Sequence, residues 1–403
     1  MPTQLARSLI LAVLVSTAPA TGRAAESFQT IAPFALLMDA DTGSVLFDKN
    51  GDGQMAPAST TKILTAEITF HEIKEGRLKL DDTFVVSENA WSSGGAKSGG
   101  STMFAALNSR ISIADLIQGL VVQSGNDAAI TLAEGISGSE DAFAALMNRR
   151  AREIGMTHSV FQNPWGRGDP NQRVTPRDMA TLAQYVIRTY PDLYHYFGER
   201  EFTWNKVRQS NRNPLLGMNI GADGLKTGDI AESGFGLVGS AVQNGERLIV
   251  VVNGLHSARD RANESFKLLN WGFRAFEPRE LYRADEVVGT ARVFGGDSTD
   301  VPLIAGTPIK LLVPRGSGDA LTGKVTYLGP LKAPVAEGTA VGQLRIFHGG
   351  SEILSVPLKT SAAVAVGSLP RRALDAGLEL GTTVIRQNFG KPPAPAAAGQ
   401  ATP

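Results

Sequence analysis

Three short motifs in the sequence combine the residue types that acyl transfer through a serine requires. They are Ser59-Thr60-Thr61-Lys62, Ser124-Gly125-Asn126 and Lys226-Thr227-Gly228, and each occurs once among the 403 residues. A serine hydroxyl is a poor nucleophile until a base removes its proton. Side chains three residues apart share one face of a helix, so Lys62 can reach Ser59 and act as that base when it is uncharged. The order and wide separation of the motifs therefore indicate a nucleophilic serine.

Two features of the surroundings would favour this chemistry. Burial and a second cation, Lys226, would both lower the pKa of Lys62 and keep its amine neutral. A helix N-terminus would favour the negative charge that develops at Ser59. The backbone N–H groups of Ser59 and Asp229 are candidate donors to an oxyanion.

The remaining motif residues could bind a substrate and pass a proton. Asn126 offers its side-chain amide to a substrate carbonyl, and Ser124 can relay a proton to a leaving group. Lys226 and Thr227, which precede Gly228, supply a charge and a hydroxyl for a substrate carboxylate. The motifs thus predict a substrate that carries a carboxylate near the bond to be cleaved.

The hydrophobic pattern places these motifs on an α+β fold. Hairpins are predicted at 34–49 and 234–254, and the Gly/Ser-rich stretch 91–102 is predicted to be a loop. Apolar residues at helical spacing predict helices at 59–73, 113–130, 140–154, 176–189 and 263–276. The second of these is broken by the Ser-Gly-Asn motif. We therefore expect an antiparallel sheet with packed helices and a helical subdomain.

The character of the sequence changes after Pro278. Short β-like runs recur between Gly/Pro turns, with spacings typical of a small β-sandwich. These runs are 292–294, 309–313, 325–328, 344–347 and 353–356. We therefore expect a catalytic domain at 26–278 and a β-sandwich domain at 279–366.

The N-terminus indicates an exported protein. Arg7, the apolar run 9–15 and the small residues around Ala20 and Ala24 have the layout of a secretory signal peptide, which we place at 1–25. Cleavage is expected after Ala20 or Ala24. The mature protein would then be periplasmic.

The C-terminus suggests attachment to a membrane surface. Residues 367–390 are predicted to form an amphipathic helix that could lie on the outer face of the cytoplasmic membrane. The alternative is a helix that packs on the second domain. A Pro/Ala-rich tail at 391–403 is expected to be disordered.

Composition excludes several other classes of protein. The 39 basic and 39 acidic residues give a net charge of zero, without the basic field of a nucleic-acid binder. With no cysteine, the chain can form no disulfide, thiolate nucleophile or cysteine-based metal site. The five histidines are scattered and match no metal-binding or triad motif. We therefore expect no metal and no cofactor.

With these motifs, the sequence resembles the low-molecular-mass penicillin-binding proteins that act as D-alanyl-D-alanine carboxypeptidases. The resemblance covers residues 30–390 and includes Asn211-Arg212-Asn213. It implies that Ser59 forms an acyl-enzyme on peptidoglycan stem peptides ending in D-Ala-D-Ala and is acylated by β-lactams. It also implies that Arg212 lies near the substrate carboxylate, and that a β-rich second domain and an amphipathic membrane anchor follow the catalytic domain.

The chain departs from that family at one position, and three other functions remain open. Asp229 follows the Lys-Thr-Gly motif where many relatives carry His or Thr. A class A β-lactamase would need a glutamate for deacylation, and the stretch 161–177 contains none. A D,D-endopeptidase acting on cross-links would use the same nucleophile, and a non-catalytic penicillin-binding sensor would need no turnover.

Overall fold

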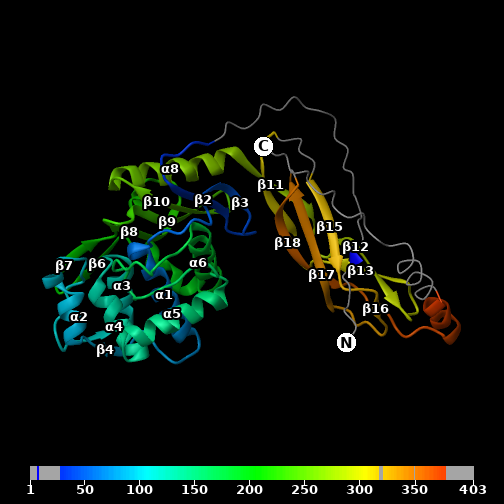
Figure 1. The fold of residues 1–403 in the computed structure, drawn as a ribbon, viewed down its shortest axis with the longest axis horizontal. Helices are drawn as coiled ribbons and strands as arrows, with labels where there is room; N and C mark the ends of the chain where they lie inside the picture. Colours follow the sequence, from blue (N-terminus) through cyan, green and yellow to red (C-terminus); the bar gives the residue numbers. More distant parts are fainter. Residues whose placement is uncertain (1–6, 9–27, 317–320, 349, 378–403) are drawn as a thin grey trace, which may run out of the picture. The chain divides into compact units, whose positions relative to one another are not determined.

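The computed structural model describes residues 7–8, 28–316, 321–348 and 350–377 (Figure 1). The chain forms two compact units, and it passes from the first to the second between Arg279 and Glu280. Leu311 and the residues directly after it belong to the first unit again. Each unit is described separately.

The first unit is built on a five-stranded antiparallel sheet of order β3-β2-β10-β9-β8. Both predicted hairpins lie in this sheet, and the Asn244-Gly245 turn joins β9 to β10. Strand β8 forms one edge. The strands are β2 (Phe34–Asp39), β3 (Val45–Lys49), β8 (Ala222–Ile230), β9 (Gly234–Gln243) and β10 (Glu246–Leu255).

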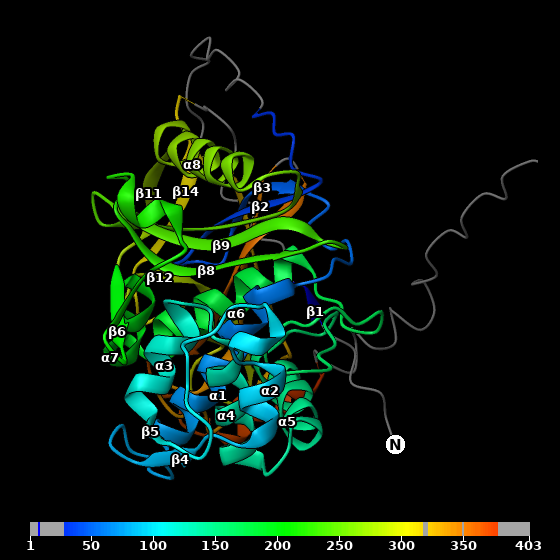
Figure 2. The same cartoon turned by 90° about the vertical axis from the view of Figure 1, so that its left-hand side faces the viewer.

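Apolar residues on both faces of the sheet are buried. Along β10, Leu248 and Val250 belong to the core beneath α8 (Ala258–Ala275), whereas Ile249 and Val251 belong to the core on the opposite face. This alternation follows from the two-residue period of a strand. Figure 2 shows α8 on one side of the sheet and the other helices on the far side.

The helices of that far side form the subdomain predicted from the sequence. Helices α5 and α6 have the predicted bounds, and each begins at a hydroxyl cap, Ser139 and Thr175 respectively. The predicted helix 113–130 is two helices, divided at the Ser-Gly-Asn motif. The helices are α1 (Lys62–Lys74), α3 (Ile113–Val121), α4 (Asn126–Ser137), α5 (Glu140–Ile154), α6 (Pro176–Thr189) and α7 (Pro191–Tyr194).

Three expectations about helices need correction. The stretch 91–102 is not only a loop, because it contains the end of α2 (Glu88–Ser93), which Ser87 caps, and the 3-10 turn η2 (Ala96–Ser98). Helix α8 begins at Ala258, before the predicted start, because Ser257 caps it by accepting from Asp260 N. Ser59 lies in the 3-10 turn η1 (Ala58–Thr61), and α1 begins at Lys62.

Short elements complete the first unit. Strands β4 (Thr83–Val85) and β5 (Arg110–Ser112) pair across the segment that contains α2 and η2, and β6 (Glu201–Trp204) and β7 (Val207–Ser210) form a short hairpin. Two further 3-10 turns, η3 (His195–Gly198) and η4 (Pro214–Gly217), precede strands.

The second unit is rich in β-structure, as predicted, and the expected runs lie in strands, except that Leu328 follows the end of β15. A seven-stranded sheet has the order β1-β15-β17-β18-β13-β12-β16. Strands β11 and β14, each of which contains a boundary between the units, pair in a separate ladder. The strands are β1 (Arg7–Ser8), β11 (Phe276–Tyr282), β12 (Val287–Phe294), β13 (Asp300–Ile304), β14 (Ile309–Pro314), β15 (Leu321–Tyr327), β16 (Leu331–Lys332), β17 (Ala340–His348) and β18 (Ser351–Thr360).

The described C-terminal end is helical over 369–377, with Leu369 and Leu374 exposed. The rest of the predicted amphipathic segment and the tail at 391–403 lie outside the described residues. So does the predicted signal segment, apart from β1. Within the described ranges, no helix has the length and apolar character needed to cross a membrane.

Candidate active site

The 3-10 turn η1, which carries Ser59, lies between two glycines. At Gly166, whose φ is +87°, a Cβ would lie 1.8 Å from the Ala58 carbonyl oxygen. At Gly228, a Cβ would lie 2.9 Å from the Pro57 carbonyl oxygen and 3.1 Å from Ser59 N. Only glycine at these positions lets β8 and the loop around Gly166 approach the serine this closely. The half-buried Ser59 thus lies level with Gly228 on the edge strand.

Lys62 is fully buried and in contact with Ser59. Its Nζ lies 3.0 Å from Ser59 Oγ, 2.8 Å from Asn126 Oδ1 and 2.6 Å from the Trp165 carbonyl oxygen. The last two atoms only accept hydrogen bonds. A neutral amine has two N–H bonds, and both are used on these acceptors. The amine lone pair is then left facing the Ser59 hydroxyl, which is the arrangement of a general base.

The electrostatics of the site favour the neutral form of Lys62. Removal of its amine from water lowers the pKa of Lys62 well below the usual lysine value. Repulsion from Lys226 and Arg212 lowers this pKa further, against the opposing effect of Asp127 and Asp229. The structure therefore contains both causes that the sequence predicted, burial and a neighbouring cation.

The Ser-Gly-Asn motif forms the turn between α3 and α4. Ser124 is buried and has a φ of +67°. The structure brings Asn126 into contact with Lys62. Among the described contacts, none joins the Ser124 hydroxyl to Ser59 or Lys62, so its relay role stays a prediction.

Asp127 anchors this turn. Its carboxylate is completely buried and accepts hydrogen bonds from Thr102 Oγ1 at 2.6 Å, Met103 N at 2.9 Å and Ala105 N at 3.0 Å. It therefore fixes the segment that follows η2 against the start of α4.

The Lys-Thr-Gly motif lies within β8. Lys226 is buried, and its Nζ donates to the Thr227 carbonyl oxygen at 3.2 Å. Burial lowers the pKa of Lys226 to about 7, helped by repulsion from Arg212 and Arg261. Lys226 can therefore gain or lose its charge near neutral pH.

Arg212 and Asp229 lie at the exposed rim of the site. Arg212 Nη1 donates to Ser101 Oγ at 2.7 Å, and the adjacent Asn213 side chain donates to the Gly224 carbonyl oxygen at 2.7 Å. This second bond ties the Arg212 segment to β8. Asp229 Oδ1 lies 3.9 Å from Arg261 Nη1, and the Asp229 side chain is 57% exposed.

The sequence reasoning missed two functional groups. Arg261 on α8 is only 7% exposed, and within the described part of the chain its Nε and Nη1 have no hydrogen-bond partner. A buried, unsatisfied guanidinium beside Lys226 is suited to an anionic ligand. The other is the Trp165 carbonyl, positioned by Asn163, whose Oδ1 accepts from Gly166 N at 2.8 Å. No motif signalled either one, and the predicted α8 helix began after Arg261.

Among the described residues, no group of three or more His, Cys, Asp or Glu side chains is arranged so that it could hold a metal ion. The chemical groups of the site are a serine, a buried lysine whose pKa is lowered, and the basic side chains of Lys226, Arg212 and Arg261.

In this protein a sheet lies between helices, and a serine contacts a buried lysine beside the edge strand. This combination of fold and site defines the class of penicillin-binding serine hydrolases. Residues 21–257 match the peptidase family described as D-alanyl-D-alanine carboxypeptidase, and residues 276–366 match the C-terminal domain of penicillin-binding protein 5. The chain belongs to the D-alanyl-D-alanine carboxypeptidase family.

Individual relatives agree with this assignment. The chain is 40% identical to the D-alanyl-D-alanine carboxypeptidase DacC of Escherichia coli K12, over 92% of this chain and 93% of that protein. Penicillin-binding protein 5 of Haemophilus influenzae has a similar structure, with a TM-score of 0.75 at 36% identity over 84% of this chain and 99% of that one. The carboxypeptidase DacD of Francisella tularensis has a TM-score of 0.69 at 32% identity, over 88% and 98% of the two chains.

Proposed function

We propose that this protein is a serine-type D-Ala-D-Ala carboxypeptidase, which removes the terminal D-alanine of peptidoglycan stem peptides through an acyl-enzyme on Ser59. The observation that carries the proposal is the 3.0 Å contact between Ser59 Oγ and the buried Lys62 Nζ, with Asn126 Oδ1 and the Trp165 carbonyl oxygen as the other two neighbours of this amine. Family membership and the relatives named above support the same activity.

Acylation begins with proton transfer from Ser59 Oγ to Lys62 Nζ. The oxygen attacks the carbonyl of the penultimate D-Ala, and the resulting oxyanion faces the backbone N–H groups of Ser59 and Asp229. The C–N bond then breaks, and the terminal D-Ala leaves with a proton returned from Lys62, for which Ser124 is the candidate relay. Water hydrolyses the ester and regenerates the serine hydroxyl. A β-lactam carbonyl would acylate Ser59 by the same first step.

The terminal carboxylate distinguishes this substrate from an internal peptide. Lys226, Arg212 and Arg261 present positive charge beside β8, and Thr227 adds a hydroxyl. Charge-assisted hydrogen bonds from such groups are about twice as strong as neutral ones. The cluster therefore supports recognition of a free C-terminal carboxylate next to the scissile bond.

Domain organisation and location extend the proposal. The catalytic domain would occupy 26–278 and the β-sandwich domain 279–366, after removal of a signal peptide at 1–25. The protein would work in the periplasm, held to the membrane surface by 367–390. The exposed Leu369 and Leu374 of the described helical end support such an anchor.

The proposal is tested by measuring D-Ala released from a pentapeptide ending in D-Ala-D-Ala. Wild type should release it, and Ser59→Ala should not. The matched control is Ser298→Ala, which removes an exposed hydroxyl in the second unit and should retain full activity. Intact mass after incubation with a penicillin should show a covalent adduct that Ser59→Ala lacks. Adduct formation without D-Ala release would instead identify a non-catalytic sensor.

A further inference from the structure

Strand β10 contains a β-bulge close to the segment that leads to Ser59. The register of β10 against β9 shifts between Val252 and Leu255, so two residues of β10 oppose one residue of β9. The two residues are Asn253 and Gly254, and the single residue is Gly236. A bulge bends its strand and re-aims a side chain. The mechanism above gives Asn253 no role, although its polar side chain is buried.

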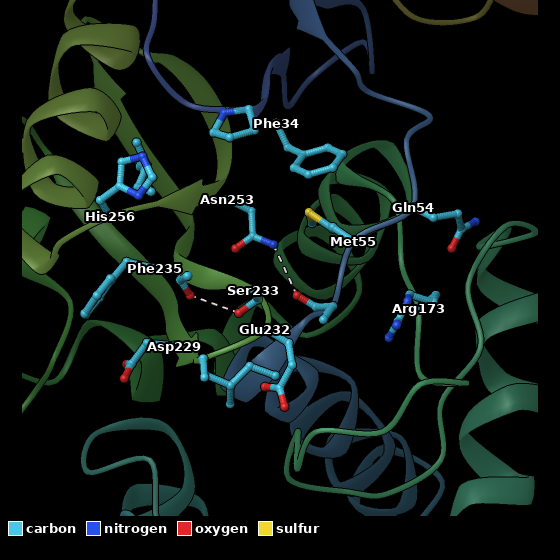
Figure 3. Close-up of a pocket in the computed structure, with 17 residues that line it drawn as sticks. Phe34, Gln54, Met55, Arg173, Asp229, Glu232, Ser233, Phe235, Asn253 and His256 are labelled. Carbon is cyan, nitrogen blue, oxygen red and sulfur yellow. Dashed lines mark hydrogen bonds between the residues drawn. The ribbon is translucent and has the colours of Figure 1, made fainter.

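The Asn253 side chain holds the segment before Ser59. Its Nδ2 donates to the Ala56 carbonyl oxygen at 3.1 Å. Figure 3 shows this bond as a dashed line from Asn253 to the chain beside Met55. Met55 is itself bridged to Val174. The chain is therefore fixed at two successive residues, three and four positions before Ser59.

Glycines on the next two strands make room for this arrangement. A Cβ at Gly236 would lie 2.3 Å from Asn253 Oδ1 and 3.0 Å from its Cγ, so a larger residue would displace the amide. Gly236 pairs with Gly228 of β8, where a Cβ would lie 3.1 Å from Ser59 N. Asn253 and the two glycines thus form a row across β10, β9 and β8, and the segment 56–59 lies against this row.

The row determines where Ser59 lies along β8. Its Oγ must meet a substrate carbonyl whose oxyanion faces the backbone N–H of Asp229 on that strand. A displacement of about 1 Å can cost on the order of 100-fold in rate. Without the Asn253 amide, the Ala56 carbonyl would lose this donor, and the segment would lose its hydrogen bond to β10.

We propose that Asn253 is a positioning residue for the nucleophile, and that it acts through the Ala56 carbonyl to hold the turn that carries Ser59 in place beside β8. Gly236 belongs to the same arrangement, because a side chain there would push the amide away from Ala56. The inference rests on the proposed function, because it takes Ser59 as the nucleophile.

The test measures acylation of the full chain by a penicillin, with the limiting rate constant and the dissociation constant of the preceding complex determined separately. Asn253→Ala should lower the rate constant about tenfold or more and leave the dissociation constant unchanged, because the cations that bind the carboxylate are kept. Asn253→Asp keeps the size of the side chain but removes the donor, so it should lose at least as much. The matched control is Asn263→Ala, which removes an exposed amide on α8 and should behave as wild type.

A double-mutant cycle tests the link between the two strands. Gly236→Ala should slow acylation by itself, because its Cβ would meet the Asn253 amide. In the Asn253→Ala background it should have little further effect, because the nearest atoms that this Cβ would meet are then absent. Additive effects of the two substitutions would overturn the link.

The outcomes separate this inference from the proposed function. Failure of a penicillin to acylate wild type would count against the proposed function. A wild-type rate constant in Asn253→Ala or Asn253→Asp would overturn the positioning role alone. A lower free energy of unfolding in urea, with the rate constant unchanged, is what a purely structural residue would give, and it would overturn the positioning role as well.

Discussion

Replacing Asp229 by asparagine should make the site more receptive to anionic ligands. Asp229 Oδ1 lies 3.9 Å from Arg261 Nη1. Two unit charges at about 4 Å attract by about 1 kcal/mol in water and about 4 kcal/mol near a protein surface. Because the Asp229 side chain is 57% exposed, the lower value applies, and about 1 kcal/mol corresponds to roughly a fivefold change in affinity. Asp229→Asn should therefore bind a carboxylate roughly fivefold more tightly.

The assay is the second-order rate of acylation by a penicillin, followed by intact mass. The rate should rise roughly fivefold for the penicillin carboxylate and stay constant for its methyl ester, which lacks the charge. The backbone N–H at position 229 is kept in the variant, so the oxyanion donors are the same. Asp81→Asn, an exposed substitution in the same unit, is the control and should change neither rate.

A second readout comes from pH. Asp229 raises the pKa of both Lys62 and Lys226. Its removal should therefore move both limbs of the pH profile of kcat/KM to lower pH. An unchanged rate for the penicillin carboxylate, or an equal increase for the ester, would refute the electrostatic reasoning.

Three further predictions concern residues that bind, shape or stabilise the site. Lys226 must be charged to hold a carboxylate, and its pKa is about 7. The kcat/KM for D-Ala release should therefore fall as the pH rises through 7. Lys226→Arg stays charged, so its kcat/KM should not fall in this pH range. Gly228→Ala would place a Cβ 2.9 Å from the Pro57 carbonyl oxygen, and penicillin acylation should slow on the order of tenfold or more as Ser59 is displaced. Asp127→Ala leaves four buried donors without this acceptor and should lower the free energy of unfolding in urea by about 2–4 kcal/mol. An equal loss in Asp81→Asn would argue against this cause.

The proposed membrane anchor at 367–390 can be tested by deletion. Deletion of 369–403 should move the protein from the membrane to the soluble fraction after cell lysis, as measured by immunoblotting. Retention in the membrane fraction would favour packing of this helix on the second unit.

The parts of the site that lie close in sequence could be predicted, because helix and strand periods fix local neighbours. The three-residue spacing of Ser59 and Lys62 is of this kind, and their contact is confirmed. The hairpin turning at Asn244 and the helix 140–154 were also predictable, from turn chemistry and apolar spacing.

The groups that sequence alone could not supply come together through tertiary packing. Arg261 is one turn into α8 and reaches the site only because that helix packs on the sheet beside β9. The Trp165 carbonyl is a backbone atom, which no side-chain motif can reveal. Helix α2 was not predicted because its C-terminal end lies in the stretch 91–102, where glycines and serines indicate a loop. The residue that caps the helix, Ser87, lies before that stretch.

The return of the chain at Leu311 has a consequence for how the protein can be divided. Leu312 is buried in the same core as Leu268 and Leu269 of α8. The chain nevertheless passes through the second unit, from Glu280 to Lys310, between α8 and this residue. A fragment cut after 278 would therefore lack a core residue and the β14 partner of β11. Within the described residues the chain crosses between the two units at 279–280 and again at 310–311, so a single proteolytic cut after 278 would not free a complete catalytic unit.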